Sequence, residues 1–388
     1  MSYGLVDYGA MVGDRVRMTA YEEALRRVVT PSSVVLDIGA GTGVMALIAA
    51  RLGARRVIAV EPNPLVRIGA RLAVENGLAD RITFVHGRSQ EIEPAELADV
   101  VVCDLRGGLP TVAIHVAAIV DARRRLMKPG AVLLPVRDTL MAAPVEAAKV
   151  FADLVKPWRE GPLGLGMSGA ESAALNEGVV RLPEIDRMLG PGVELATLEY
   201  AEVESAGFHR KLELPVEREG VMHGLAVWFD TVLVEGVGFS TAPNLEKTVY
   251  GRLFLPLPEP AEVAAGDVVR ASVRAVVEDD EYLWIWSGRV RGEDGSERAA
   301  FTSSSAFFNP ENPAVLEVAH EGCVPALSGD GRLVGQVLQG MDGACSVAEL
   351  ADRLLDGHPG RFEYREDALA FVQSVVRRYG ETMLRLDG

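Results

Sequence analysis

The sequence predicts an α/β protein in which a Rossmann-like, doubly wound parallel sheet is followed by an antiparallel β-barrel and a small helical C-terminal module. Three observations support this. Strands alternate with helices in residues 1–135, apolar residues recur with a period of two in 136–308, and apolar spacing is helical in 309–388. Alternating strands and helices are typical of a parallel sheet covered on both faces. We therefore expect three domains with these bounds.

The first domain is expected to contain five strands separated by helices. Two helical stretches come first and end at Pro31. The later segments are predicted as strands over 34–36, 57–60, 82–85, 99–103 and 131–134 and as helices over 44–52, 65–76 and 114–127. Ligands of such sheets bind beyond the carboxyl ends of the strands. A functional site is therefore expected at that edge.

The second domain has the pattern of half-buried antiparallel strands. Apolar residues alternate with polar ones over 269–277, and 225–234 and 282–290 follow the same pattern. Asp279 and Asp280 are expected to form a hairpin turn. Many such strands are typical of a barrel or sandwich. A helix-like apolar insertion at about 161–188 has no core of its own in this interpretation, so we expect another subunit to cover it.

The third domain is expected to contain three helices and a short strand at 382–386. Helical apolar spacing covers 333–341 and 369–379, and a capping box from Ser346 to Glu349 starts a helix between them that ends at Gly357. This pattern resembles the small winged-helix modules that bind leader or carrier peptides in peptide-natural-product pathways. A stabilising appendage is the alternative.

Composition excludes several classes of function. The chain has 39 basic and 55 acidic residues and a net charge of −16, with no concentrated basic surface, so we expect no nucleic-acid partner. Its three cysteines are irregularly spaced and no HExxH pair occurs, which argues against a disulfide framework or a metal site. No apolar run reaches about 18 residues, so no membrane span is expected. The first 15 residues lack a signal-peptide pattern, and a cytoplasmic protein is expected.

The candidate ligand site centres on a glycine-rich turn. Gly39, Gly41 and Gly43 follow the first strand, and Glu61 ends the second. Glycines let the backbone approach a ligand closely, and a carboxylate at the end of the second strand can accept both hydroxyls of a ribose. A dinucleotide-binding domain would use the same logic, so the turn alone does not identify the ligand.

Three further details distinguish the two possibilities. The glycine spacing is G-x-G-x-G, Asp37 precedes the turn, and the strand ADVVVCD ends at Asp104 with LMKPGAVLLP following. Together they resemble the class I S-adenosylmethionine-dependent methyltransferases. The likeness extends over about residues 8–305 to the protein arginine methyltransferases, through an N-terminal helix (Met11, Asp14, Arg17, Tyr21 and Ala24), the segment HGLAVWFD from His223 and the segment GFSTAP from Gly238.

The resemblance implies a cofactor, a site and an assembly. S-adenosylmethionine would be the cofactor, with Arg17 on its carboxylate, Glu61 on its ribose, and Ser89 and Gln90 beside adenine. Gln90 stands where the family usually has an acidic residue, but an amide can also accept from an adenine amino group. Met11, Asp37 and the three glycines of the turn complete the expected cofactor site. The apolar insertion at 161–188 lies where the family carries its dimerisation arm, which implies a homodimer.

The departures from the family concern the acceptor. Arginine methyltransferases grip guanidinium with two glutamates, because two carboxylates neutralise the cation and orient its fork. Here the first position is Asp104, the candidate catalytic residue, and the second is Ala113. Asp104 lies either in the acceptor site or in a strand-end cap. Arg106 would repel a guanidinium, and it either contacts an anionic acceptor or is a solvated loop charge. The family's Thr-His-Trp loop reads Thr248-Val249-Tyr250, so its histidine is absent.

We therefore expect a methyltransferase with an arginine-methyltransferase-like scaffold and a non-arginine acceptor. The acceptor would be an amino acid, a peptide or another small molecule in specialised-metabolite biosynthesis. Two alternatives stay open: a true protein arginine N-methyltransferase with an atypical acceptor pocket, and an inactive, cofactor-binding interaction protein.

Overall fold

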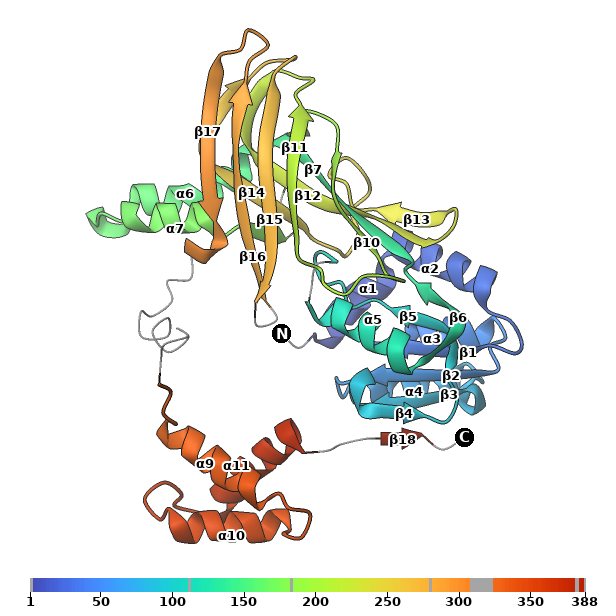
Figure 1. The fold of residues 1–388 in the computed structure, drawn as a ribbon. Helices are drawn as coiled ribbons and strands as arrows, with labels where there is room; N and C mark the ends of the chain where they lie inside the picture. Colours follow the sequence, from blue (N-terminus) through green and yellow to red (C-terminus); the bar gives the residue numbers. More distant parts are fainter. Residues whose placement is uncertain are drawn as a thin grey trace. The chain divides into compact units, whose positions relative to one another are not determined.

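The computed structural model describes residues 3–110, 113–181, 184–278, 281–307, 324–380 and 384–386. The chain divides into two compact units. One comprises Met1–Pro310 with Leu386–Gly388, and the other comprises Glu311–Arg385 (Figure 1). The first unit contains both the parallel sheet and the antiparallel strands that the sequence predicts.

A five-stranded parallel sheet forms the core of the N-terminal part (Figure 1). Its strands, in spatial order, are β3 (Ile82–His86), β2 (Arg56–Glu61), β1 (Val34–Ile38), β5 (Ala98–Cys103) and β6 (Met127–Leu134). The accompanying helices are α1 (Leu5–Gly13), α2 (Arg15–Val28), α3 (Val44–Arg51), α4 (Val66–Glu75) and α5 (Ala113–Arg125). The predicted Rossmann-like parallel sheet is confirmed.

Both faces of this sheet are buried, as the continuous apolar strands predict. Every residue of β1 is buried. Val35 packs with residues of α2 and α3 on one face, whereas Leu36 packs with residues of α5 on the other. Because successive side chains point to opposite faces, a strand covered on both sides is apolar at nearly every position, and Asp37 is the polar residue of β1.

Two antiparallel sheets follow and enclose the largest apolar cluster, which gives a barrel-like domain. One has the order β10 (Val193–Glu199), β7 (Arg137–Glu146), β12 (Gly220–Val234), β14 (Arg252–Val263) and β8 (Val179–Arg181), with β13 (Val237–Ser240) on β12 and β9 (Arg187–Met188) on β7. The other has the order β11 (Phe208–Pro215), β15 (Val268–Glu278), β16 (Glu281–Arg291) and β17 (Glu297–Ser304). The expected turn at Asp279 and Asp280 lies outside the described residues.

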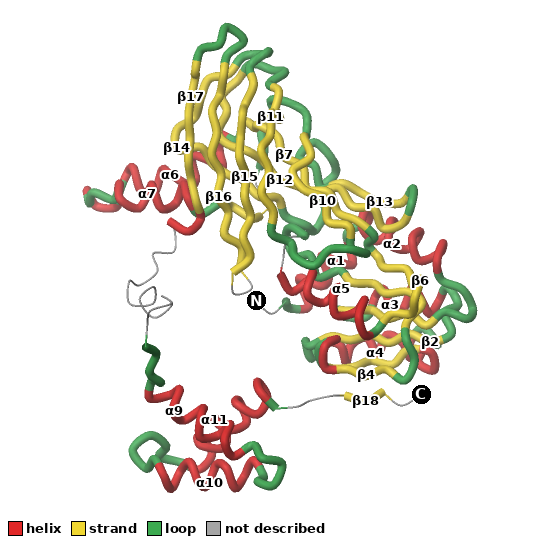
Figure 2. Tube along the Cα trace, in the orientation of Figure 1, coloured by secondary structure: helices red, strands yellow, loops and turns green. Residues whose placement is uncertain are grey.

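The helical insertion differs from its prediction. It is a hairpin of α6 (Ala148–Glu160) and α7 (Ser168–Asn176), so it begins before residue 161, and only part of 161–188 is helical (Figure 2). Phe151, Val155 and Leu175 pack together between the two helices. The expectation that the insertion lacks a core of its own was therefore wrong.

Residues 324–380 of the second unit contain three helices, as predicted for this stretch. They are α9 (Gly329–Gly340), α10 (Val347–Gly357) and α11 (Arg365–Tyr379), and they share one apolar cluster (Figure 2). The Ser346 hydroxyl accepts from the backbone N–H of Glu349, and the Glu349 carboxylate accepts from the backbone N–H of Ser346, so the predicted capping box is present. A short strand, β18 (Leu384–Leu386), follows. Residues 324–380 contain no strand, so this described stretch has no wing hairpin.

Candidate active site

The predicted site residues gather at the carboxyl edge of the parallel sheet. Ser89 follows β3, Glu61 ends β2, Gly39 follows β1 and Asp104 follows β5. Because these four strands are neighbours in this order, the four positions form a row along one edge. Of the remaining predicted residues, Asp37 lies in β1 and Gln90 follows Ser89, whereas the others lie in the turn after β1 or on α1 and α2.

The glycine-rich turn has a left-handed backbone. Gly39, Gly41 and Gly43 have φ values of 72°, 57° and 81°, which favour glycine. A Cβ on Gly41 would lie 2.4 Å from Cε1 of Tyr8, a residue of α1. The turn therefore excludes side chains, and α1 covers it directly.

Glu61 holds this turn in place. Its Oε2 accepts from the backbone N–H of Gly41 at 2.8 Å, and its Oε1 accepts from the backbone N–H of Asn63 at 2.7 Å. An ionised carboxylate offers about four acceptor positions. These two contacts leave room for two hydroxyl donors, as binding of a ribose requires.

Asp37 supports the helix that follows the turn. Its Oδ2 accepts from the backbone N–H of Ala46 in the first turn of α3, at 3.0 Å. The side chain is buried, and this burial raises its pKa to about 7. The observed contact of Asp37 is thus with the protein backbone.

The residues expected beside the two ends of the cofactor differ in exposure. Ser89 is buried, whereas Gln90 is exposed. On α1, the carbonyl oxygen of Met11 accepts from Nη1 of Arg17 at 3.2 Å. Arg17 itself is almost fully buried.

Both carboxylate oxygens of Asp104 contact donor groups of the chain itself. Its Oδ1 accepts from Nε of Arg106 at 2.9 Å. Its Oδ2 receives Nε and Nη2 of Arg17, both at 2.8 Å, and the hydroxyl of Tyr250 at 2.6 Å. Burial alone would raise the pKa of Asp104, but the guanidinium groups of Arg106 and Arg17 hold it well below its usual range. Three of these donors contact Oδ2, whose acceptor positions are thereby filled, whereas Oδ1 accepts from Arg106 and keeps one acceptor position.

Arg106 is neither a solvated charge nor free to contact an anionic acceptor, and both expectations were wrong. Its side chain is 0% exposed. Each of its five N–H groups has an acceptor: Asp104 (2.9 Å) for Nε, Asp138 (3.1 Å) and Thr231 (2.9 Å) for Nη1, and Tyr21 (2.9 Å) and Tyr250 (2.8 Å) for Nη2. Its charge is neutralised within the protein.

Aromatic rings enclose the same guanidinium. Its central carbon lies 4.8 Å from the ring centroid of Tyr250, 5.3 Å from that of Phe229 and 5.5 Å from that of Phe239. These distances are within the range of cation–π attraction. No sequence pattern singled out Asp138, Thr231 and Phe229, which line the space around the Arg106 guanidinium.

Tyr250 contacts both arginines of this cluster through its hydroxyl oxygen, which accepts from Nε of Arg17 and Nη2 of Arg106. Burial raises its pKa, and its hydroxyl donates to Asp104. A phenol that stays protonated cannot serve as a general base near neutral pH. Asp104 is equally unsuited, because a strongly acidic carboxylate has little affinity for a proton.

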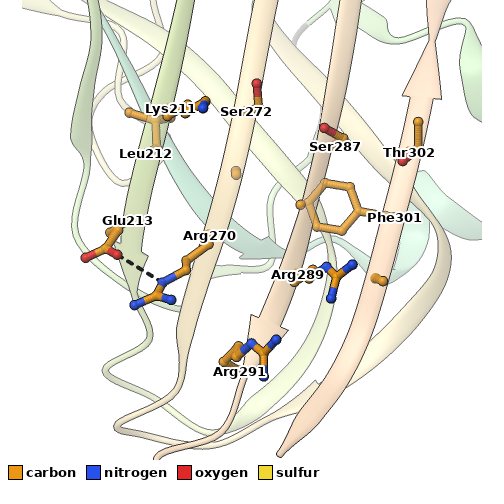
Figure 3. Close-up of a pocket in the computed structure, with 13 residues that line it drawn as sticks. Lys211, Leu212, Glu213, Arg270, Ser272, Ser287, Arg289, Arg291, Phe301 and Thr302 are labelled. Atoms are coloured by element: carbon orange, nitrogen blue, oxygen red, sulfur yellow. Dashed lines mark ion pairs between the residues drawn. The ribbon is translucent and has the colours of Figure 1, made fainter. Parts of the chain in front are cut away.

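Other features lie away from this edge. A cavity of about 810 Å³ lies on the outer face of the four-stranded sheet and shares no residue with the site (Figure 3). Glu213 pairs with Arg270 there, and Glu297 pairs with Arg289, so its basic character is partly neutralised. Among the described residues, no cluster of His, Cys, Asp or Glu could hold a metal ion, and no helix is long and apolar enough to cross a membrane.

Comparisons with known proteins agree with this architecture. Residues 136–286 match the family model of the arginine methyltransferase oligomerization subdomain, and residues 19–134 match that of the ribosomal protein L11 methyltransferase. A probable protein arginine N-methyltransferase 6 of Arabidopsis thaliana is 29% identical over 254 residues, covering 61% of this chain and 56% of the relative. The chain thus spans little more than half of that relative's length. A probable protein arginine N-methyltransferase 1.2 of the same plant is 27% identical, covering 68% of this chain and 74% of the relative.

Solved structures share the fold. The enzyme–prozyme complex of Trypanosoma brucei PRMT1 with AdoHcy gives a TM-score of 0.71 at 22% identity, covering 78% of this chain and 98% of the other. Protein arginine methyltransferase 10 of Arabidopsis thaliana gives 0.69 at 19% identity, covering 78% and 97%. The fold and the sequence are together similar to those of class I, S-adenosylmethionine-dependent methyltransferases. Within that class, the scaffold resembles that of the protein arginine methyltransferases.

Proposed function

We propose that this chain transfers a methyl group from S-adenosylmethionine to an acceptor other than a guanidinium group. The observation that supports this most directly is that Arg106, Arg17 and Tyr250 already donate to the carboxylate of Asp104. A guanidinium acceptor needs free carboxylate oxygens to neutralise and orient it. Both oxygens of Asp104 already accept from the chain, the position left on Oδ1 cannot provide a two-point grip, and Ala113 has no carboxylate.

The row of residues along the sheet edge suits the cofactor. In this proposal adenine lies by Ser89 and Gln90, the ribose by Glu61, and the methionine part over the glycine turn. Among the described residues, Nη1 of Arg17 contacts the carbonyl of Met11 and the sulfur of Met18, and a thioether is a weak acceptor. In this proposal the cofactor carboxylate replaces the Met18 sulfur as a partner of Nη1, while Nε and Nη2 stay on Asp104.

The cofactor supplies an activated methyl group on a sulfonium, and the chain supplies binding and alignment of the two reactants. Asp104 follows the strand next to the glycine turn, so the acceptor would lie at this end of the row. With Asp104 and Tyr250 both unsuited as bases, the site favours an acceptor whose lone pair is already free. A carboxylate meets this condition, whereas a phenol or a protonated amine does not.

The cluster around Arg106 has balanced charges, which changes the reason why a guanidinium acceptor would be rejected. Two arginines (Arg17 and Arg106) and two aspartates (Asp104 and Asp138) balance, so Arg106 does not add a net repulsion. A third cation would meet no unpaired carboxylate. At about 4 Å and an effective dielectric of 20, each missing ion pair corresponds to about 4 kcal/mol. We thus attribute the rejection of a guanidinium acceptor to the pairing of both aspartates with arginines of the chain.

Radiolabelled transfer assays test the acceptor. The protein is incubated with methyl-labelled cofactor and either arginine-rich peptides or a panel of amino acids and peptides with free carboxylates. We expect no methylarginine and label on an uncharged or anionic group. Efficient methylarginine formation would favour arginine methylation, the activity named for the relatives. Micromolar cofactor binding without transfer to any acceptor would favour an inactive interaction protein, which the closed Asp104 also suits.

We further propose a homodimer formed through the α6–α7 hairpin. Leu163 and Leu165, between the two helices, are 100% and 61% exposed, which is costly for a free surface. The match of 136–286 to an oligomerization subdomain supports this. Light scattering should give twice the chain mass of 41.6 kDa, and Leu163→Asp with Leu165→Asp should reduce it to one chain. A monomeric wild type at micromolar concentration would contradict the assignment.

A further inference from the structure

We propose that the chain contains a complete guanidinium-binding cage, and that its own Arg106 fills this cage and thereby determines acceptor specificity. The specificity claim rests on the proposed methyl transfer, whereas the binding claim does not. An emptied cage should bind free guanidinium or an alkylguanidinium.

The cage matches all five donors of a guanidinium group. Asp104 and Asp138 supply carboxylates on two sides of the fork, so the two-carboxylate grip that Ala113 cannot provide is made with Asp138 instead. The hydroxyl oxygens of Thr231, Tyr21 and Tyr250 accept the remaining hydrogens. Complementarity of this kind is what recognition of a planar cation requires.

The walls have contacts that do not depend on Arg106. Asp138 accepts from the hydroxyl of Tyr200 at 2.6 Å, and Asp104 is held by Arg17. The ring of Tyr250 stacks on that of Phe239 with centroids 5.6 Å apart and planes at 14°. Removal of the Arg106 side chain would therefore leave carboxylates and rings in position around a vacant volume.

The cage joins two parts of the first unit. Tyr21 and Asp104 come from the Rossmann-like part, and Asp138, Phe229 and Thr231 come from strands β7 and β12 of the barrel-like part. Arg106 reaches it from the residues that follow β5. A free arginine side chain would have to displace a tethered competitor whose five donors are already satisfied, and this competition excludes guanidinium acceptors.

Chemical rescue tests the cage. Arg106→Ala should be destabilised, and 10 mM guanidinium or n-propylguanidinium chloride should raise its unfolding temperature by about 3 °C or more, as expected for a millimolar site near saturation. The wild type should show no increase. Urea, which is planar but uncharged, and ammonium chloride at equal concentration should not rescue the variant.

Arg252→Ala provides a matched control. Arg252 is also buried, but its guanidinium donates to the backbone carbonyls of Thr241 and Ala242. Guanidinium should rescue this variant much less, because carbonyls alone do not neutralise the cation. If Arg106→Ala is insoluble, refolding with and without propylguanidinium gives the same information through the yield of soluble protein.

Each outcome decides between the claims. Rescue of Arg106→Ala that exceeds both the wild type and Arg252→Ala supports the cage. Absence of rescue, or equal rescue of both variants, overturns the cage even if the wild type methylates a carboxylate. Rescue combined with efficient arginine methylation by the wild type keeps the binding site but overturns the specificity claim and the proposed acceptor class.

Discussion

Replacement of Asp104 by asparagine should strongly destabilise the first unit. The change leaves Arg17 and Arg106 with only one carboxylate between them, and both guanidinium groups are nearly or fully buried. An asparagine also presents an NH₂ group where one carboxylate oxygen now accepts, so a donor faces either Arg106 or the Arg17–Tyr250 pair. Loss of one partner from a buried ion pair costs about 3–5 kcal/mol.

Urea unfolding followed by tryptophan fluorescence measures this cost. All four tryptophans of the chain lie in the first unit, so the signal does not report on Glu311–Arg385. With an m value of about 3 kcal/mol/M, the midpoint should fall by about 1–1.7 M. Because the pKa of Asp104 is depressed in the folded state, its contribution is present above the unfolded pKa and is lost as the pH falls. The difference between wild type and variant should therefore shrink as the pH is lowered from about 5.

Two matched variants define the comparison. Asp138→Asn should cost less than Asp104→Asn, because burial raises the pKa of Asp138 and its charged form is less favoured. Glu204→Gln removes a carboxylate that is 59% exposed and binds Arg123 and Arg124, and it should cost less than about 1 kcal/mol. A cost for Asp104→Asn as small as that of Glu204→Gln would refute the buried network.

Three further predictions concern other parts of the molecule. Gly41 has a φ of 57°, and a Cβ there would lie 2.4 Å from Tyr8, so Gly41→Ala should weaken cofactor binding at least tenfold in calorimetry. Gly53→Ala should leave cofactor binding unchanged, because its Cβ would meet nothing within 4 Å. Equal losses of cofactor affinity in the two variants would contradict this expectation. Asp37→Asn should gain stability over the wild type as the pH rises toward about 7, since a pKa raised from 3.8 to about 7 corresponds to about 4 kcal/mol, and urea midpoints that keep a constant difference from pH 5 to 8 would argue against it. Leu354→Ala, in the buried core of the second unit, should cost that unit about 2–5 kcal/mol in hydrogen exchange without moving the tryptophan-detected midpoint, and a shift of both would show that the units unfold together.

The sheet edge could be predicted from the sequence because its signals are local. The glycine spacing, the apolar strand before it and Glu61 at the end of the next strand all fall within one βαβ segment. The alternation of strands and helices then implies that neighbouring strand ends share an edge. These features correctly placed Gly41, Glu61 and Asp104 together.

The environment of Arg106 could not be predicted in the same way, because its partners are distant in sequence. Asp138, Thr231 and Tyr250 are 32, 125 and 144 residues away. An arginine three residues after a strand normally reaches solvent, and only tertiary packing buries it here. One usable signal was present in the sequence. Asp138 and Leu140 are two residues apart in β7 and therefore point to the same face of the sheet. Because Leu140 is buried, this spacing places the Asp138 carboxylate on the inner face.

The helical hairpin shows a different difficulty. Phe151, Leu154 and Val155 have helical spacing, but Pro157 lies within the same helix. An internal proline usually ends or kinks a helix, which obscures the local signal for α6. The predicted insertion therefore begins at about residue 161, whereas α6 begins at Ala148.

The claim that Arg106 closes the guanidinium site of its own chain is tested most directly by a crystal structure of the protein with S-adenosylhomocysteine. We expect the adenosine to lie between Ser89 and Glu61. Asp104 should still accept from Nε of Arg106 and from Arg17, with Nη1 of Arg106 on Asp138. If Arg106 instead turns out of the cage when the cofactor product binds, and leaves Asp104 open beside the sulfur, the claim that the chain closes its own guanidinium site is contradicted.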